Sequence, residues 1–308
     1  MDRIVDIATD GRHLSLHRGF LVVSQDREEV GRIALDDVHA VLLHAHGTTW
    51  SANLIAALAE RGAPVVHCGA NHAPVAITLP LVGHHAQNAR FRAQWGASAP
   101  LTKQLWRQLV SAKIGMQGAV LAWREVAGAE AFPLMARRVK SGDSDNLEAQ
   151  AARRYWPLLM GADFRRDRDS PGANALLNYG YAVLRASVAR AVVAAGLHPT
   201  IGIAHANRGN PLALADDLIE PFRPLVDALV VTLVADGVAE LTPPIKRRFA
   251  RLIAFDLDFE GEASPVSLAA VRLAQSLARA FETGRPALRL FAPPTPLEWA
   301  ALVAVGAD

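Results

Sequence analysis

IGIAHANRGNPLALADDLIEPFRP, residues 201–224, combines a helical repeat of apolar residues with a cluster of acids. The spacing predicts a helix that begins near Pro211, on which Asp217 and Glu220 share a face with Arg223. An adjacent apolar stripe consists of Leu214, Leu218, Phe222 and Leu225. Because this stripe would dock the helix into a core, the segment is expected in a helical domain with acids at the edge of its buried face.

The two carboxylates of this helix have two explanations. Asp217 and Glu220 would repel each other at a buried edge and are costly to desolvate unless a cation compensates them. A divalent metal ion is one such cation, and Arg223 or a neighbouring arginine is the other. His205, in the loop before the helix, lies close enough along the chain to reach its first turns. A single loop histidine is also common at a surface, so spacing alone leaves both explanations open.

A further acid lies in SGDSDNLEAQAARRYW (141–156), where Glu148 opens a predicted helix. Asp145 and Glu148 have the spacing of a capping box, which would explain both residues without any chemistry. If Glu148 instead converges with His205 and Glu220, two carboxylates and an imidazole form a hard site that suits Mg²⁺ or Mn²⁺. Such a site is typical of nucleases and strand-transfer enzymes.

Other phosphate and acyl-transfer motifs do not occur in the chain. It has no Gly-Lys pair for a Walker loop, no G-x-G-x-x-G and no G-x-S-x-G. None of these motifs therefore offers an alternative to phosphate chemistry at a metal site.

The two halves of the chain have different patterns. Residues 1–82 contain short β-branched or alternating segments and predict a small β-rich domain, interrupted by a helix between Ser51 as N-cap and Gly62 as C-terminal stop. Pro, Gly and polar residues predict a linker over 83–100, and helical spacing predominates over 101–308. The predicted fold class is α+β, with the small β-rich N-terminal domain followed by a larger, mainly α-helical domain.

Composition describes a globular chain. The 308 residues are 51% apolar and have a formal net charge of +2. No apolar run reaches the roughly 18 residues of a membrane span, because Asp227 and Asp236 interrupt the best candidate, and the N-terminus lacks a signal-peptide pattern. The single cysteine, Cys68, excludes an intramolecular disulfide framework and a cysteine-clustered zinc site. We therefore expect a cytoplasmic protein with no membrane partner.

Basic residues gather in four short segments, 136–140, 152–156, 164–168 and 246–251. Four of the 32 basic residues are lysine, so the other 28 are arginine, whose planar guanidinium suits phosphate. One such cluster is usually a solvated helix face, but several around one acidic site predict a nucleic-acid track. The predicted DNA-binding residues are Arg137, Arg138, Arg153, Arg154, Arg165, Arg166, Arg223, Lys246, Arg247 and Arg248.

Three long segments resemble a known family, the CRISPR-associated adaptation integrase, which is the first of the Cas proteins. The segments are NLEAQAARRYW (146–156), the stretch from DSPGANALLNYG to DLIEPFRPLVD (169–227), and the stretch from LHRGF to AITLPL (16–81). The motifs N-L-E-x-Q-A, G-L-x-P-x-I-G with its following His, and D-L-I-E-P-F-R-P occur in the family's order. The similarity runs over nearly the whole chain.

The resemblance implies that the α-helical domain over 101–308 is the catalytic domain, which binds metal and DNA, and it implies roles for individual residues. Glu148, His205 and Glu220 match the family's catalytic, metal-binding triad, and Asp217 matches a nearby assisting acid. Many relatives have Asp where this chain has Glu220, so a carboxylate is retained. Asp216 falls on the other side of the helix and has no implied role. The compact length and the form DLIEPFRP resemble type II members.

The resemblance also implies a function. Such a protein inserts short prespacer DNA into the CRISPR array: the prespacer 3′-hydroxyl attacks a phosphodiester of the repeat, a transesterification that needs no ATP. The implied cofactor is Mg²⁺ or Mn²⁺. The implied partners are double-stranded DNA (prespacer and repeat), a second copy of the chain bound through the N-terminal parts, and the small second CRISPR-associated adaptation protein, which bridges two dimers.

Two other functions would use the same residues differently. A metal-dependent endonuclease acting on branched or single-stranded DNA would use water in place of the 3′-hydroxyl. A non-catalytic DNA-binding scaffold would have all of its acids capped or salt-bridged.

Overall fold

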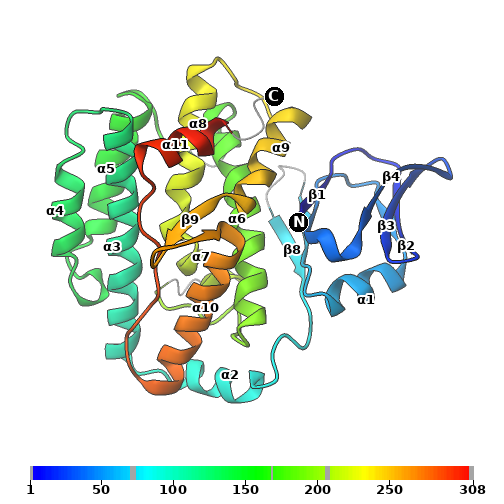
Figure 1. Cartoon of the computed structure of the whole chain (residues 1–308), viewed down its shortest axis with the longest axis horizontal. Helices are drawn as coiled ribbons and strands as arrows, with labels where there is room; N and C mark the ends of the chain where they lie inside the picture. The colour runs from blue at the N-terminus through cyan, green and yellow to red at the C-terminus, as the bar shows by residue number, and fades with distance from the viewer. Residues whose placement is uncertain (1–2, 70–73, 168, 205–208, 305–308) are drawn as a thin grey trace.

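The computed structural model describes residues 3–69, 74–167, 169–204 and 209–304. A β-rich N-terminal region, β1–β8, lies at one end of the molecule and is followed by a mainly helical region (Figure 1). This arrangement is the α+β class expected from the sequence. None of the described helices is both long and apolar enough to cross a membrane.

An antiparallel meander forms the outer sheet of the β-rich region. Its strands are β2 (Arg12–His17), β3 (Phe20–Gln25) and β4 (Glu28–Ala34), and β6 (Thr49–Trp50) pairs with β2 on the other side. Both hairpin turns, Arg18–Gly19 and Asp26–Arg27, have positive φ at their two central residues. This turn geometry matches the right-handed twist of the paired strands.

The second sheet has the order β1-β5-β7-β8. Its strands are β1 (Arg3–Ile7), β5 (Val38–Leu43), β7 (Val65–Cys68) and β8 (Pro74–Thr78). The first three are parallel and β8 is antiparallel to β7. A short 3-10 turn, η1 (Leu35–Asp37), precedes β5, and the crossover from β5 to β7 contains α1 (Ala52–Glu60). As predicted, α1 starts after Ser51 and is followed by Gly62, whose φ is 69°.

Strand β5 is buried on both faces and joins the two regions. Its residues Val41 and Leu43 belong to a core shared with the meander and α1, whereas Ala40 and Leu42 belong to the core of the helical region. This explains why every residue of VHAVLL is buried. Arg190 also donates to the carbonyl of His39 at 2.8 Å.

The helical region is built around α6, which is buried along most of its length. The helices and 3-10 turns are α2 (Gln87–Trp95), α3 (Ala99–Trp123), α4 (Ala131–Arg138), η2 (Ser141–Asp143), α5 (Leu147–Met160), α6 (Ala173–Ala194), α7 (Ala213–Leu218), η3 (Glu220–Phe222), α8 (Arg223–Ala235), α9 (Pro243–Arg251), η4 (Leu252–Ala254), α10 (Val266–Thr283) and α11 (Pro296–Ala304). Gly180 allows α8 and α9 to approach α6, because a Cβ there would lie 2.5 Å from Val226 Cγ1 and 2.9 Å from the Phe249 ring.

The predicted linker over 83–100 is largely helical. It contains α2 and the start of α3, where Ser98 Oγ accepts a hydrogen bond from Leu101 N at 3.4 Å. Arg90 on α2 pairs with Glu282 at 2.8 Å, which attaches α2 to α10. The division of the chain into domains at these boundaries remains a prediction.

The segment predicted as one helix from Pro211 is divided into α7, η3 and α8. Pro221 and Pro224 have no amide hydrogen, so the regular helical ladder is interrupted there. The amide of Phe222 donates to the carbonyl of Ile219 at 2.8 Å, which is the tighter 3-10 pattern. Glu220 therefore begins a tight turn between two helices.

A β-hairpin inside the helical region was not predicted. It consists of β9 (Asp256–Phe259) and β10 (Glu262–Pro265). Leu257 and Phe259 are buried and alternate with exposed acids, and Gly261 in the turn has a φ of 88°. This short period-two alternation was the available signal in the sequence.

Candidate active site

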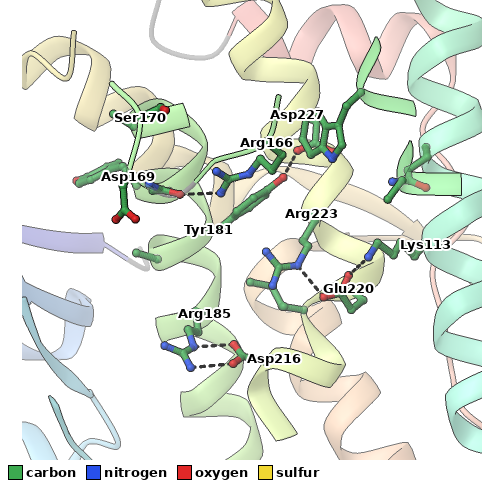
Figure 2. Close-up of a pocket in the computed structure, with 18 of the residues that line it drawn as sticks. Lys113, Arg166, Asp169, Ser170, Tyr181, Arg185, Asp216, Glu220, Arg223 and Asp227 are labelled. Carbon is green, nitrogen blue, oxygen red and sulfur yellow. Dashed lines mark hydrogen bonds and ion pairs between the residues drawn. The ribbon is translucent and has the colours of Figure 1, made fainter. Parts of the chain in front are cut away.

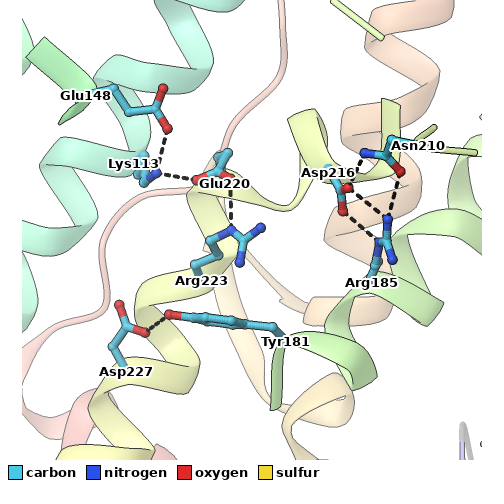
Figure 3. A network of polar contacts seen from close by, with 9 residues as sticks. All are labelled: Lys113, Glu148, Tyr181, Arg185, Asn210, Asp216, Glu220, Arg223 and Asp227. Carbon is cyan, nitrogen blue, oxygen red and sulfur yellow. Dashed lines mark hydrogen bonds and ion pairs between the residues drawn. The ribbon is translucent and has the colours of Figure 1, made fainter. Parts of the chain in front are cut away.

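Glu148 and Glu220 converge on the ammonium group of Lys113 (Figure 3). Glu148 lies in the first turn of α5, Glu220 begins η3, and Lys113 lies on α3. Lys113 Nζ is 2.7 Å from Glu148 Oε1 and also contacts Glu220 Oε2. Three elements that are distant in sequence thus bring the two predicted carboxylates to one cation.

Glu220 also pairs with Arg223, whose Nε lies 2.9 Å from Glu220 Oε1. The side chain of Glu220 is 5% exposed, so its charge depends on these partners. Burial opposes the charge on Arg223, but Glu220 raises the pKa of the guanidinium above its ordinary value. Burial likewise opposes the charge on Lys113, and Glu220 and Glu148 raise its pKa. Glu220 therefore forms the arginine pair that the sequence offered as an alternative to metal binding. It also shares the ammonium group of Lys113 with Glu148.

The start of α5 is fixed by Asp143, which thereby positions Glu148. The Asp143 carboxylate accepts hydrogen bonds from the amides of residues 147 and 148 at 2.8 and 3.0 Å. The capping-box explanation for Asp145 and Glu148 is wrong, because Asp145 Oδ2 pairs with Lys140 Nζ at 2.9 Å. The Glu148 side chain is directed to the buried cation instead of to the helix end.

Asp217, the predicted assisting acid, holds the chain just before His205. Its Oδ2 accepts hydrogen bonds from the amide of Ile203 and, at 3.2 Å, from the amide of Ala204. The Asp217 side chain is completely buried. His205 itself lies outside the described residues, so its convergence with the two glutamates remains a prediction.

Asp216, which was left out of the predicted site, pairs with an arginine and an amide and also lines the cavity described below. Its carboxylate lies 2.7 Å from Arg185 Nε and accepts from the Asn210 amide at 2.6 Å. This group lies beside the glutamates and forms a separate ion pair (Figure 3).

A cavity of about 890 Å³ opens beside the two glutamate partners Lys113 and Arg223 (Figure 2). Its lining combines cationic, carboxylate, amide and aromatic groups. They include Gln117, Trp156, Arg166, Asn178, Tyr181, Arg185, Glu220 and Asp227. A cavity of this composition can hold a phosphate together with an adjacent planar group.

A buried aspartate on α8 links two tyrosines to the site. Asp227 accepts hydrogen bonds from Tyr155 at 3.1 Å and from Tyr181. Burial raises the pKa of Asp227 to about 6, although the tyrosine hydroxyls oppose this shift. The guanidinium carbon of Arg223 lies 4.6 Å from the centroid of the Tyr181 ring. The hydrogen bond from Tyr181 to Asp227 therefore fixes the ring against which the Arg223 guanidinium packs.

Sequence reasoning missed Lys113, Asp227 and Tyr181. Asp227 had a visible signal, since it is an isolated charge in the apolar run LVDALVV. The signal for Lys113 was weaker: the chain has four lysines, and this one lies among apolar residues of a long predicted helix. Their relation to Glu148 and Glu220 depends on how α3, α5 and α8 pack, which spacing does not give.

The ten predicted DNA-binding residues fall into three groups. Those with exposed side chains are Arg137, Arg138, Arg153, Arg154, Arg165 and Arg247. Arg166 and Arg223 line the cavity. Lys246 and Arg248 have internal partners, since Lys246 pairs with Asp6 at 3.0 Å and Arg248 donates to the Val303 carbonyl. DNA contact by any of them remains a prediction.

The donors present fit a hard divalent cation. Two carboxylates from different elements already point at one positive charge, and carboxylate oxygens are ligands that Mg²⁺ and Mn²⁺ prefer. Within the described part of the chain, no cluster of three or more His, Cys, Asp or Glu side chains could hold a metal ion. The third predicted ligand, His205, falls outside that part.

Known proteins share the sequence pattern. The family model described as CRISPR associated protein Cas1 matches residues 5–242. The CRISPR-associated endonuclease Cas1 of Neisseria meningitidis serogroup C is 39% identical over 255 residues, which cover 82% of this chain and 83% of that protein.

Two solved structures share the fold. A casposase bound to integration product superimposes with a TM-score of 0.78 at 21% identity, covering 93% of this chain and 92% of that chain. A Cas6-RT-Cas1–Cas2 complex gives a TM-score of 0.75 at 20% identity, covering 96% of this chain and 36% of that chain. At these identities the likeness concerns the fold.

Proposed function

Because the chain belongs to the Cas1 family of CRISPR-associated proteins, we propose that it is a metal-dependent integrase of prespacer DNA. The observation that carries this proposal is the convergence of Glu148 and Glu220 on one cation beside a cavity with three arginines. A site of this charge pattern can hold both a divalent ion and the phosphates on which it acts.

The proposed reaction exchanges one phosphodiester for another. The 3′-oxygen of the prespacer forms a bond to a phosphorus of the repeat while one P–O bond of the repeat backbone breaks. The hydroxyl proton passes to solvent, and the leaving oxygen takes one up. Since bond number is conserved, the reaction needs no nucleotide hydrolysis.

The residues have distinct proposed roles. Glu148 and Glu220, with His205, would hold Mg²⁺ or Mn²⁺. Such an ion supplies positive charge that favours ionisation of the attacking hydroxyl and neutralises the phosphoryl oxygens. Arg223, fixed between Glu220 and the ring of Tyr181, would bind a phosphate oxygen at the cavity wall.

The partners follow from the same family membership. We propose double-stranded DNA as substrate, a homodimer formed through the β-rich region, and the small second protein of the adaptation machinery, Cas2, as the bridge between two dimers. A solved complex of the same fold contains both Cas1 and Cas2. We also propose that the protein belongs to a type II CRISPR system and that it is cytoplasmic.

Two alternatives have some support. The Neisseria relative is named an endonuclease, and water in place of the 3′-hydroxyl would give cleavage at the same site. The pairing of Glu220 with Lys113 and Arg223 would also suit a scaffold without chemistry.

A strand-joining assay separates these functions. A labelled short duplex with a free 3′-hydroxyl is incubated with a plasmid that carries a leader and repeat, the protein, Cas2 and Mn²⁺. The matched control duplex ends in a 3′-dideoxynucleotide. We expect label on the plasmid only with the free hydroxyl. Nicked but unlabelled plasmid would indicate an endonuclease, and intact plasmid with DNA bound would indicate a scaffold.

A further inference from the structure

Lys113 lies where a cation held by both glutamates would lie. Its Nζ is 2.7 Å from Glu148 Oε1 and in contact with Glu220 Oε2. A divalent ion would contact the same oxygens at about 2.1 Å. Because two positive charges repel strongly at contact distance in a poorly solvated site, the ammonium and the metal cannot share this gap.

The charges of the group are balanced without a metal. Glu148 and Glu220 contribute two negative charges, and Lys113 and Arg223 contribute two positive ones. A divalent ion would leave an uncompensated charge in a site where Lys113 is 13% and Glu220 5% exposed. Arg223 is held by the ring of Tyr181, whereas the lysine ammonium is carried on a flexible four-carbon stem. Lys113 is therefore the cation that can move.

The cavity offers the ammonium a second position. Gln117 lies one helical turn beyond Lys113 on the same face of α3 and is 3% exposed. Its Oε1 is buried and accepts no hydrogen bond from the residues that the structure describes. Lys113, Gln117 and Asp227 all line the cavity. A displaced ammonium would satisfy the Gln117 oxygen in a space that also contains a carboxylate.

We infer that Lys113 is an internal competitor of the divalent cation: its ammonium holds Glu148 and Glu220 together when no metal is bound and moves towards Gln117 when the metal binds. This inference rests on the proposed metal site. It makes Lys113 a positioning residue that sets how much metal the protein requires.

The first test measures Mn²⁺ affinity in the absence of DNA, from the electron paramagnetic resonance signal of free Mn²⁺. Lys113→Met keeps the length and bulk of the side chain and removes the charge, so we expect it to bind Mn²⁺ at least about tenfold more tightly than the unmodified protein. Lys246→Met is the matched control, because Lys246 is also paired and 16% exposed but contacts Asp6. Equal or weaker binding by Lys113→Met would overturn the inference.

The same titration separates this inference from the proposed function. If Glu220→Gln abolishes a Mn²⁺ site that Lys113→Met leaves unchanged, the metal site stands and the role of Lys113 is wrong. If neither the unmodified protein nor Lys113→Met binds Mn²⁺, the metal site and the inference both fail.

A second measurement uses the unmodified protein and does not depend on how the variant folds. The chain has four lysines, so reductive methylation followed by mass spectrometry reports on each of them. We expect Mn²⁺ to increase the methylation rate of Lys113 several-fold, with Lys246 unchanged. If Mn²⁺ binds while Lys113 methylation is unchanged or slower, the ammonium has not moved and the inference is overturned.

Discussion

Arg223 Nε lies 2.9 Å from Glu220 Oε1, and the guanidinium rests on the Tyr181 ring. This pair gives Glu220 a structural partner in addition to its proposed ligand role. A loss of stability on mutation is therefore expected under either role, and only chemistry measured on folded protein distinguishes them.

The Glu220→Gln variant should lose its chemistry while remaining folded. It keeps the size of the side chain but leaves Lys113 and Arg223 without one carboxylate, which we expect to cost about 3 kcal/mol of stability. Loss of a metal ligand should reduce strand joining at least about a hundredfold with DNA affinity nearly unchanged. Glu282→Gln, which breaks the pair with Arg90, is the control and should join normally. Near-normal joining by folded Glu220→Gln would remove Glu220 from the active site.

The capping of α5 predicts opposite outcomes for two nearby aspartates. Asp143→Ala removes the acceptor of two amides at the helix start, so it should cost about 1 to 2 kcal/mol in urea denaturation. Asp145→Ala removes only exposed contacts with Lys140 and Ser144 and should leave the urea midpoint nearly unchanged. The reverse order would restore the capping box and contradict the position of Glu148.

Asp217 should control the backbone that leads into His205. Asp217→Ala leaves the amides of Ile203 and Ala204 without their buried acceptor, and we expect a cost of about 2 kcal/mol. Amide hydrogen exchange at 203 and 204 should accelerate at least about tenfold, while α3 is unaffected. Unchanged exchange at these two amides would show that Asp217 does not anchor this segment.

The buried carboxyl of Asp227 should make stability depend on pH. An unfolded aspartate titrates near pH 4, whereas burial raises the pKa of Asp227 to about 6, so the folded state holds this proton more tightly. Its stabilising contribution is therefore full below about pH 4 and is lost as the pH rises to about 6. The stability of the unmodified protein relative to Asp227→Asn should fall by roughly 2 to 3 kcal/mol across this window. Parallel curves would show that Asp227 does not titrate there.

The sequence predicted the helices and strands better than it predicted how they pack against one another. Alternating and helical patterns located α1, most strands of the β-rich region and the long helices, because these patterns reflect which side faces the core. The hairpin β9–β10 was not predicted, because its alternation of apolar and polar residues is short and lies between segments with strong helical spacing. The single helix expected from Pro211 was wrong because Pro221 and Pro224 interrupt its hydrogen bonds.

In the site, the sequence pointed to Glu148 and Glu220 but not to what lies between them. Lys113 reaches both only through the packing of α3 against α5 and η3, which has no local signature. Asp143 and not Asp145 accepts the hydrogen bonds at the start of α5. Both Asp143 and Asn146 have a left-handed backbone, with φ of 50° and 53°, a detail that residue spacing does not specify. Long-range packing and local backbone geometry thus determined what spacing could not.

A crystal of the protein with Mn²⁺, measured at the manganese absorption edge, would show directly whether Glu148 and Glu220 hold a metal ion. We expect one anomalous peak within about 2.1 to 2.3 Å of carboxylate oxygens of Glu148 and Glu220 and of an imidazole nitrogen of His205, with Lys113 Nζ withdrawn from both glutamates. A Mn²⁺ ion bound elsewhere, with Lys113 still between Glu148 and Glu220, would contradict the proposed metal site.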